Sequence, residues 1–116
     1  MKDKISDKLR IEHGMQAIQE IFSYTVGKSF EEFNSDSMVR SACMHQLSII
    51  GDAFANLSPS LKSEHTTVDW RGYIGLRIKV VHVYFGIDYK IVWNIMQEEL
   101  PALYSELNQI YNSLLL

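Results

Sequence analysis

The chain has 116 residues, of which 47% are hydrophobic and 22% charged, and a formal net charge of −3 at pH 7. These values are typical of one folded domain, residues 1–116, and exclude a multidomain enzyme and a disordered tail. We find no apolar run long enough for a membrane span and no signal peptide, so we expect a cytoplasmic protein. The single cysteine, Cys43, excludes an internal disulfide and a cysteine-rich zinc site. The negative charge argues against indiscriminate coating of nucleic acid.

The first quarter of the chain has the pattern of a long amphipathic helix. Apolar residues recur at intervals of three and four over residues 5–26, which predicts a helix that ends at Gly27. Ser29 and Glu32 then have the spacing of a capping box, in which each side chain bonds the other residue's backbone N–H. A short helical turn should therefore begin at this point.

A second long helix is predicted over residues 36–57, after which Ser58 and Pro59 have the pattern that opens another short turn. Within this helix Cys43 and His45 could suggest a metal-binding pair. Because residues two apart diverge by about 200° around a helix, we instead expect Cys43 to be buried and His45 to face away.

Asp69 is the predicted N-cap of a third helix, residues 70–84, which is apolar around much of its circumference. Gly72 and Gly75 each weaken such a helix by about 1 kcal/mol relative to alanine. Their presence indicates that another backbone approaches closely. Gly86 should end this helix.

Asp88 should cap a last helical stretch that extends to residue 116. Pro101 lacks a backbone donor and should kink or break this stretch near Glu98. No segment alternates in the manner of a strand. The predicted fold class is therefore all-α, an up-and-down bundle of four or five main helices.

Basic residues concentrate in one segment of this acidic chain. Residues 70–90 have a local charge of +3, which leaves −6 on the remainder, because four basic side chains oppose one acid: Arg71, Arg77, Lys79, Lys90 and Asp88. The excess can be an accident of a short window or a phosphate-binding patch. In the second interpretation Arg71 and Lys79 are candidate contacts to RNA phosphates.

Arg77 and His82 are the best catalytic candidates in this segment. Five residues separate them by about 140° around a helix, so they cannot share one narrow face and a second surface must complete a site. A two-fold dimer, permitted by the small Gly75, would gather two copies of each. An imidazole can exchange the proton of a ribose hydroxyl, and a guanidinium can hold the phosphate. The alternative for His82 is a histidine that only interacts with the helix C-terminus.

The run from residue 70 to residue 103, WRGYIGLRIKVVHVYFGIDYKIVWNIMQEELPAL, contains a distinctive series of short motifs. It begins with Arg-x4-His-x-Tyr at Arg77, His82 and Tyr84. There follow Phe85-Gly86-Ile87-Asp88, Ile91-Val92-Trp93 and Glu99-Leu100-Pro101. This run resembles the signature region of the HepT family of HEPN-domain proteins, and the resemblance continues upstream over nearly the whole chain.

The resemblance implies a helical HEPN-type bundle that dimerises and forms a metal-independent endoribonuclease cleft, without a cofactor, from Arg77 and His82 of both subunits. HepT proteins are toxins of toxin–antitoxin pairs, whose partner is a minimal nucleotidyltransferase, MntA. In some pairs this partner transfers AMP from ATP onto the motif tyrosine, which is Tyr84 here. The resemblance thus implies that a bulky anionic adduct on Tyr84 would repel RNA.

The chain departs from the family pattern at two positions. Ile78 stands where family members usually carry a polar residue, often Asn, and Ser48 stands where Glu is expected. Three alternatives remain open: a slow ribonuclease, a ribonuclease that uses another polar residue such as Arg40 or Asp52, and a non-catalytic all-α subunit that only binds the nucleotidyltransferase.

Overall fold

Helices make up nearly all of the computed structural model, which describes residues 2–82 and 86–114, with the backbone alone for residue 2 and residues 77–82. No strand occurs among these residues, so the predicted all-α class is confirmed. In chain order the elements are α1 (Lys2–Thr25), α2 (Phe30–Ser35), α3 (Ser37–Ala55), α4 (Pro59–Glu64), α5 (Trp70–His82), α6 (Tyr89–Asn94), the π-helical turn η1 (Ile95–Glu99) and α7 (Leu100–Ser113).

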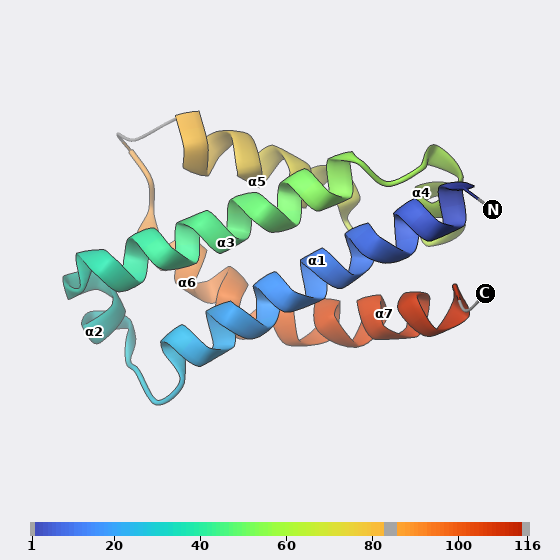
Figure 1. Cartoon of the computed structure of the whole chain (residues 1–116). Coiled ribbons are helices and arrows are strands. Elements are labelled where there is room, and N and C mark those ends of the chain that lie inside the picture. Colours follow the sequence, from blue (N-terminus) through green and yellow to red (C-terminus); the bar gives the residue numbers. More distant parts are fainter. Residues whose placement is uncertain (1, 83–85, 115–116) are drawn as a thin grey trace.

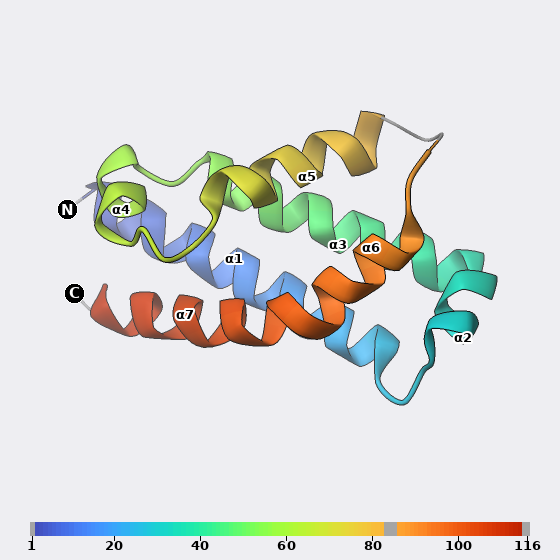
Figure 2. The same cartoon turned by 180° about the vertical axis from the view of Figure 1, so that it is seen from behind.

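The long helices run up and down, with both described ends of the chain at the same end of the molecule (Figure 1). Helix α3 packs against α1 on one side and α5 on the other, and α7 lies along α1. Seen from behind, α6 crosses toward α7 (Figure 2). The prediction of four or five main helices is confirmed by α1, α3, α5 and the nearly continuous α6–η1–α7.

Local capping chemistry sets most of the helix ends. Gly27 has a φ of +73°, which ends α1 in a conformation that suits glycine. The capping box is present, because the Ser29 N–H donates to Glu32 Oε1 at 2.9 Å and the Glu32 N–H donates to Ser29 Oγ at 3.2 Å. Ser58 caps α4 ahead of Pro59, also as predicted. These short-range signals therefore act as the sequence indicates.

Pro101 produces the predicted interruption through a widened turn. It has no N–H to donate to the carbonyl of Gln97, and its ring would crowd that carbonyl in a regular α-helix. The chain instead forms the π-helical η1, and the Leu100 N–H donates to the Ile95 carbonyl, five residues back. Met96 and Leu100 are both buried in the resulting arrangement. The extra residue in this wider turn thus keeps the apolar side of the interrupted helix in the core.

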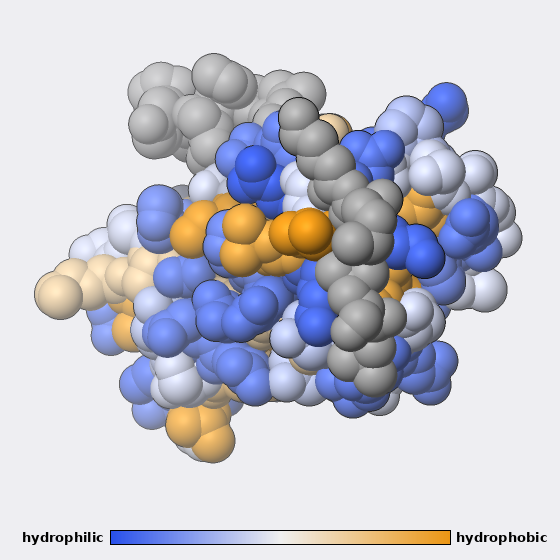
Figure 3. Space-filling model, turned by 45° about the vertical axis from the view of Figure 1, so that its right-hand side comes forward, coloured by the Kyte–Doolittle hydropathy of each residue, from blue (hydrophilic) through white to orange (hydrophobic). Residues whose placement is uncertain are grey.

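The core lies between α1, α3, α5 and α7. Phe54 near the end of α3 contacts Trp70 and Tyr73 at the start of α5, with ring centroids 4.8 and 5.8 Å apart. Cys43 is buried and His45 is exposed, as predicted. On the face shown in Figure 3, hydrophilic residues predominate and hydrophobic ones form small patches. Within residues 2–82 and 86–114, no helix combines the length and hydrophobicity that crossing a membrane requires.

The two glycines of α5 do not have the predicted surroundings within the chain. A Cβ on Gly72 would overlap the side chain of Asp69, which caps the same helix, and a Cβ on Gly75 would have no atom of the described residues within 4 Å. No backbone that the structure describes therefore approaches Gly75, contrary to the prediction. Gly75 instead borders open space beside α5.

Candidate functional site

The motif segment occupies the C-terminal half of α5. The helix runs as far as His82, so the backbone positions of Arg77 and His82 are about 7.5 Å apart along the axis and about 140° apart around it. The side chains of Arg77, Lys79 and His82 lie outside the described residues, as does the whole of Tyr84. The contacts predicted for these four residues therefore remain predictions.

Helix α5 runs antiparallel to α3. This orientation determines how far the two accessory candidates, Arg40 and Asp52, lie from the His82 end of α5. Because the start of α5 packs on Phe54, the end at His82 lies beside the first half of α3 (Figures 1 and 2). Arg40 belongs to that half, whereas Asp52 is twelve residues further on, about 18 Å along the helix. Arg40 and Asp52 therefore cannot contact the same phosphate group.

Arg40 is already engaged in packing at this end of the bundle. Its Nη1 donates to the carbonyl of Asn34, and its guanidinium lies 5.0 Å from the centroid of the Tyr89 ring. Its Nε is buried and has no hydrogen-bond partner among the described residues. One side chain thus joins α3 to α2 and to α6, next to the segment that follows the motif.

Asp52 is exposed on α3, and its backbone carbonyl accepts a hydrogen bond from Asn56 Nδ2 at 2.8 Å.

Neither Cys43 nor His45 belongs to a metal-binding cluster, because no group of three His, Cys, Asp or Glu side chains in the described ranges is placed to hold an ion.

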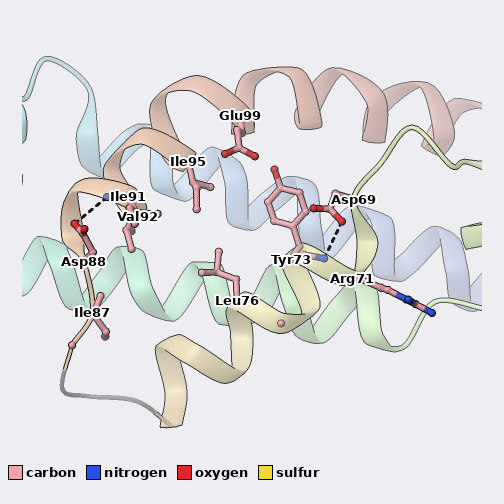
Figure 4. A pocket seen from close by; sticks show the side chains of 13 residues that line it. Asp69, Arg71, Tyr73, Leu76, Ile87, Asp88, Ile91, Val92, Ile95 and Glu99 are labelled. Atoms are coloured by element: carbon pink, nitrogen blue, oxygen red, sulfur yellow. Dashed lines mark hydrogen bonds between the residues drawn. The ribbon is translucent and has the colours of Figure 1, made fainter.

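A groove of about 770 Å³ lies between α5 and the α6–η1 segment (Figure 4). Its middle is aliphatic, with Leu76, Ile91 and Ile95 directed into it. The whole lining consists of Asp69, Arg71, Gly72, Tyr73, Gly75, Leu76, Gly86, Ile87, Asp88, Ile91, Val92, Ile95 and Glu99. On the α5 side, Gly75 leaves space at the groove, because no atom of the described residues lies within 4 Å of where its Cβ would be.

Acidic groups dominate the polar part of this groove. Tyr73 lies beside Glu99 and Asp69, and Figure 4 shows its hydroxyl directed toward Glu99. Burial, with the carboxylates of Glu99, Asp69 and Glu106, raises the pKa of Tyr73 to about 12, so its hydroxyl stays protonated at neutral pH. Arg71 is exposed and extends away from the centre of the groove (Figure 4). Among the described lining residues, the three carboxylates of Asp69, Asp88 and Glu99 thus outnumber the one basic side chain, that of Arg71.

The sequence predictions did not include this groove. Arg71, which the sequence analysis proposed as a phosphate contact, lines this groove together with Asp69 and Tyr73, and its contact with phosphate stays a prediction. Asp69 and Tyr73 are four residues apart on one helix face, which is a signal that sequence reasoning could have used. Glu99 comes from a distant part of the chain and gives no such signal.

Comparisons with known proteins agree on one family. A sequence model of the family described as Ribonuclease HepT-like matches residues 15–110. A protein of Caldanaerobacter subterraneus subsp. tengcongensis named "Putative RNase" is 34% identical over 100 residues, which cover 86% of this chain and 89% of that protein. A protein of Thermococcus cleftensis named "Probable ribonuclease HepT" is 34% identical over 100 residues, which cover 86% of this chain and 91% of that protein. No solved structure matches the chain significantly.

Proposed function

This chain belongs to the Ribonuclease HepT-like family, and from that premise we propose that it is a metal-independent endoribonuclease toxin that acts as a homodimer. The family match over residues 15–110, which includes the whole of α5, carries this proposal. The names of the similar proteins, which refer to ribonucleases, support the same activity. The local positive charge of residues 70–90 supports an RNA substrate, because phosphate binding requires basic side chains.

The proposed reaction uses Arg77 and His82 from two subunits. One imidazole removes the proton of a ribose 2′-hydroxyl, and the 2′-oxygen attacks the adjacent phosphorus. The second imidazole protonates the leaving 5′-oxygen, so that the products are a 2′,3′-cyclic phosphate and a 5′-hydroxyl. Arg77 stabilises the negative charge that builds up on the phosphate oxygens. Two copies are needed because the two positions diverge by about 140° on one helix.

Lys79 is a further candidate for phosphate binding in this cleft, since it lies on the same helix between the two catalytic candidates. Arg71 is a weaker candidate for phosphate binding, because the groove that it borders is also lined by the carboxylates of Asp69, Asp88 and Glu99. Arg40 is the better placed accessory residue of the two on α3, because its half of that helix lies beside the His82 end of α5.

Regulation is proposed to act on Tyr84. A partner nucleotidyltransferase would transfer AMP from ATP to the phenolic oxygen and release pyrophosphate. The added phosphate is negatively charged and would repel the RNA backbone two residues from His82. Incubation with the nucleotidyltransferase and ATP should add the mass of AMP to the wild-type chain and not to Tyr84→Phe. Equal labelling of the two proteins would overturn the assignment of Tyr84.

The ribonuclease activity is tested by RNA cleavage in the presence of EDTA, with the wild-type chain, His82→Ala and His45→Ala. We expect the wild type to cleave RNA, and His82→Ala to lose at least about a hundredfold in rate, which is the usual size of acid–base catalysis. His45→Ala is the matched control, because His45 is exposed on α3 and has no proposed role. Equal rates for all three proteins would contradict the catalytic assignment.

A second candidate function follows from Ile78, which replaces the polar residue usual in the family. An isoleucine cannot orient a phosphate or ribose, so the chain would then be a non-catalytic subunit that only binds the nucleotidyltransferase. The same assay separates the two functions. This candidate requires that wild-type protein and His82→Ala both fail to cleave RNA while both still bind the nucleotidyltransferase.

A further inference from the structure

The first residue of α6, Tyr89, belongs to an aromatic cluster at the end of the bundle where α2 lies. The centroid of its ring is 5.0 Å from the guanidinium carbon of Arg40 on α3. The same ring meets that of Phe33 on α2 in a T-shaped arrangement, with centroids 6.3 Å apart. Phe33 is fully buried and Tyr89 is half-buried. The Tyr89 ring is thus held by two other helices, and its contact with Phe33 does not depend on the charge of Arg40.

The rest of α6 has anchors of its own. The ammonium of Lys90 lies 4.5 Å from the centroid of the Phe30 ring. Trp93, one turn further on, packs against Phe30 and Phe33 with ring centroids 6.4 and 5.2 Å apart. A substitution at Tyr89 therefore leaves α6 attached to α2 and disturbs mainly the first turn of α6.

Tyr89 is close along the chain to the end of the motif helix. Helix α5 runs as far as His82, and Gly86 is four positions later, so the Cα atoms of these two residues are at most about 14 Å apart. A groove separates α5 from the α6–η1 segment (Figure 4), and α5 packs mainly on α3. The start of α6 therefore restrains the His82 end of α5 chiefly through this short connection.

Helix α3 is the common support for both sides of the connection. The His82 end of α5 lies beside the first half of α3, to which Arg40 belongs (Figures 1 and 2). Because Arg40 also contacts Tyr89, the start of α6 is held against the same part of α3 as the motif end of α5. Catalytic groups must be held within about 1 Å of their working geometry, so a loss of this hold has a large effect on rate.

We propose that Tyr89 is a positioning residue for His82. Its ring fixes the start of α6 against α3 and α2, and the fixed start of α6 holds the His82 end of α5 in place on α3. The ring has this role and the hydroxyl does not, because both contacts are made by the ring. The effect on RNA cleavage rests on the proposed ribonuclease function, whereas the hold on α5 can be measured without RNA.

Three variants of the full chain test the proposal. Tyr89→Leu removes the ring, and Tyr89→Phe keeps the ring and removes only the hydroxyl. Tyr111→Leu is the matched control, because Tyr111 is also half-buried and its ring centroid lies 5.0 Å from a cation, Lys8 Nζ. Tyr111 belongs to the last turns of α7, at the opposite end of the bundle from α2 (Figure 1).

Backbone amide hydrogen exchange, followed by NMR without RNA, measures the hold on α5. We expect residues 77–82 to exchange at least about fivefold faster in Tyr89→Leu than in the wild type, because this end of the helix opens more often. Exchange there should stay at the wild-type rate in Tyr89→Phe and in Tyr111→Leu. Thermal unfolding of the two leucine variants should show similar decreases in Tm, because each loses one tyrosine ring and one cation–π contact.

RNA cleavage measures the catalytic consequence. Tyr89→Leu should lower kcat about tenfold or more and leave KM within about twofold of the wild-type value, because geometry is lost and RNA contacts are kept. Tyr89→Phe should restore kcat, and Tyr111→Leu should not change it.

Four results would overturn the positioning role. The first is wild-type exchange of residues 77–82 in Tyr89→Leu. The second is equally fast exchange in Tyr111→Leu, which would indicate general destabilisation. In the third, Tyr89→Phe behaves like Tyr89→Leu, which would assign the effect to the hydroxyl. A rise in KM without a fall in kcat is the fourth, because it would make Tyr89 a contact to RNA.

Failure of the proposed function has a different signature. If the wild-type chain does not cleave RNA but Tyr89→Leu speeds exchange of residues 77–82 as expected, the ribonuclease proposal fails and the hold of Tyr89 on α5 stands.

Discussion

The guanidinium carbon of Arg40 lies 5.0 Å from the centroid of the Tyr89 ring, so α3 is held against the first turn of α6 by a cation–π contact. Both residues lie next to the segment that follows the Arg-x4-His motif. Arg40 therefore has two roles to separate: it packs the end of the bundle, and it is a candidate for contacting RNA.

Arg40→Met should distinguish these roles, because it keeps an unbranched side chain and removes the charge. We expect the free energy of unfolding to fall by about 1–2 kcal/mol, from the lost cation–π contact and the hydrogen bond to Asn34. If Arg40 also binds phosphate, KM for RNA rises while kcat stays near the wild-type value. Arg10→Met is the matched control, since Arg10 is another half-buried arginine whose Nε has no described partner. An equal rise in KM for both variants would exclude a specific contact from Arg40.

The parts of the structure that the sequence predicted are those that depend on residues close together in the chain. The capping box of Ser29 and Glu32 and the N-caps at Ser58 and Asp88 involve partners two or three residues apart, so their chemistry is visible in the sequence. Pro101 marked the interruption of the last helix for the same reason. The sequence did not predict that this interruption would take the form of a π-helical turn. The form of the turn depends on which side chains the core accepts.

The candidate groove could not be predicted in this way. Tyr73 and Glu99 meet only because α5 and η1 pack against a common core, and Arg40 meets Tyr89 only because α3 and α6 share an end of the bundle. Contacts of this kind depend on the tertiary arrangement, which short-range patterns do not encode. The catalytic pair Arg77 and His82 came from a motif and a family resemblance, and it stays a prediction until their contacts are measured.

Asp7 should contribute strongly to stability although it is far from the motif. Its buried carboxylate accepts the Ser58 N–H at 2.8 Å and the Ser58 hydroxyl at 2.6 Å, which ties α1 to the N-cap of α4. Asp7→Ala removes both bonds and leaves the Ser58 N–H without this partner. We expect a loss of about 2–4 kcal/mol in urea unfolding. Glu64→Ala, at an exposed position of α4, should change stability by less than about 0.5 kcal/mol; a similar loss there would refute the role of Asp7.

The two glycines of α5 should respond differently to alanine. Gly75→Ala has room for its Cβ and should raise the free energy of unfolding by about 1 kcal/mol through helix propensity. Gly72→Ala should bring no such gain, because its Cβ displaces the Asp69 carboxylate that caps the helix. Thermal unfolding of the two variants measures the difference.

Gly75→Ala also tests whether two copies of α5 meet at this glycine. If the proposed dimer packs there, the added methyl group weakens dimerisation, which light scattering over a range of concentrations detects. A variant that is more stable and dimerises as well as the wild type would place the contact elsewhere on α5. A variant that is less stable than the wild type would contradict the open space found around Gly75 in the single chain.

Cys43 should make the stability of the fold depend on alkaline pH. Burial raises the pKa of its thiol to about 11, whereas the thiol of the unfolded chain has a pKa of about 8.5. Between these values the unfolded chain loses the proton and the folded chain keeps it, so the free energy of unfolding falls as pH rises from about 9 to about 11. The full loss is about 3 kcal/mol. Cys43→Ala lacks this contribution and should show a shallower decline over the same range, in urea unfolding measured at each pH. Parallel declines for the two proteins would mean that the Cys43 thiol titrates alike in the folded and unfolded states.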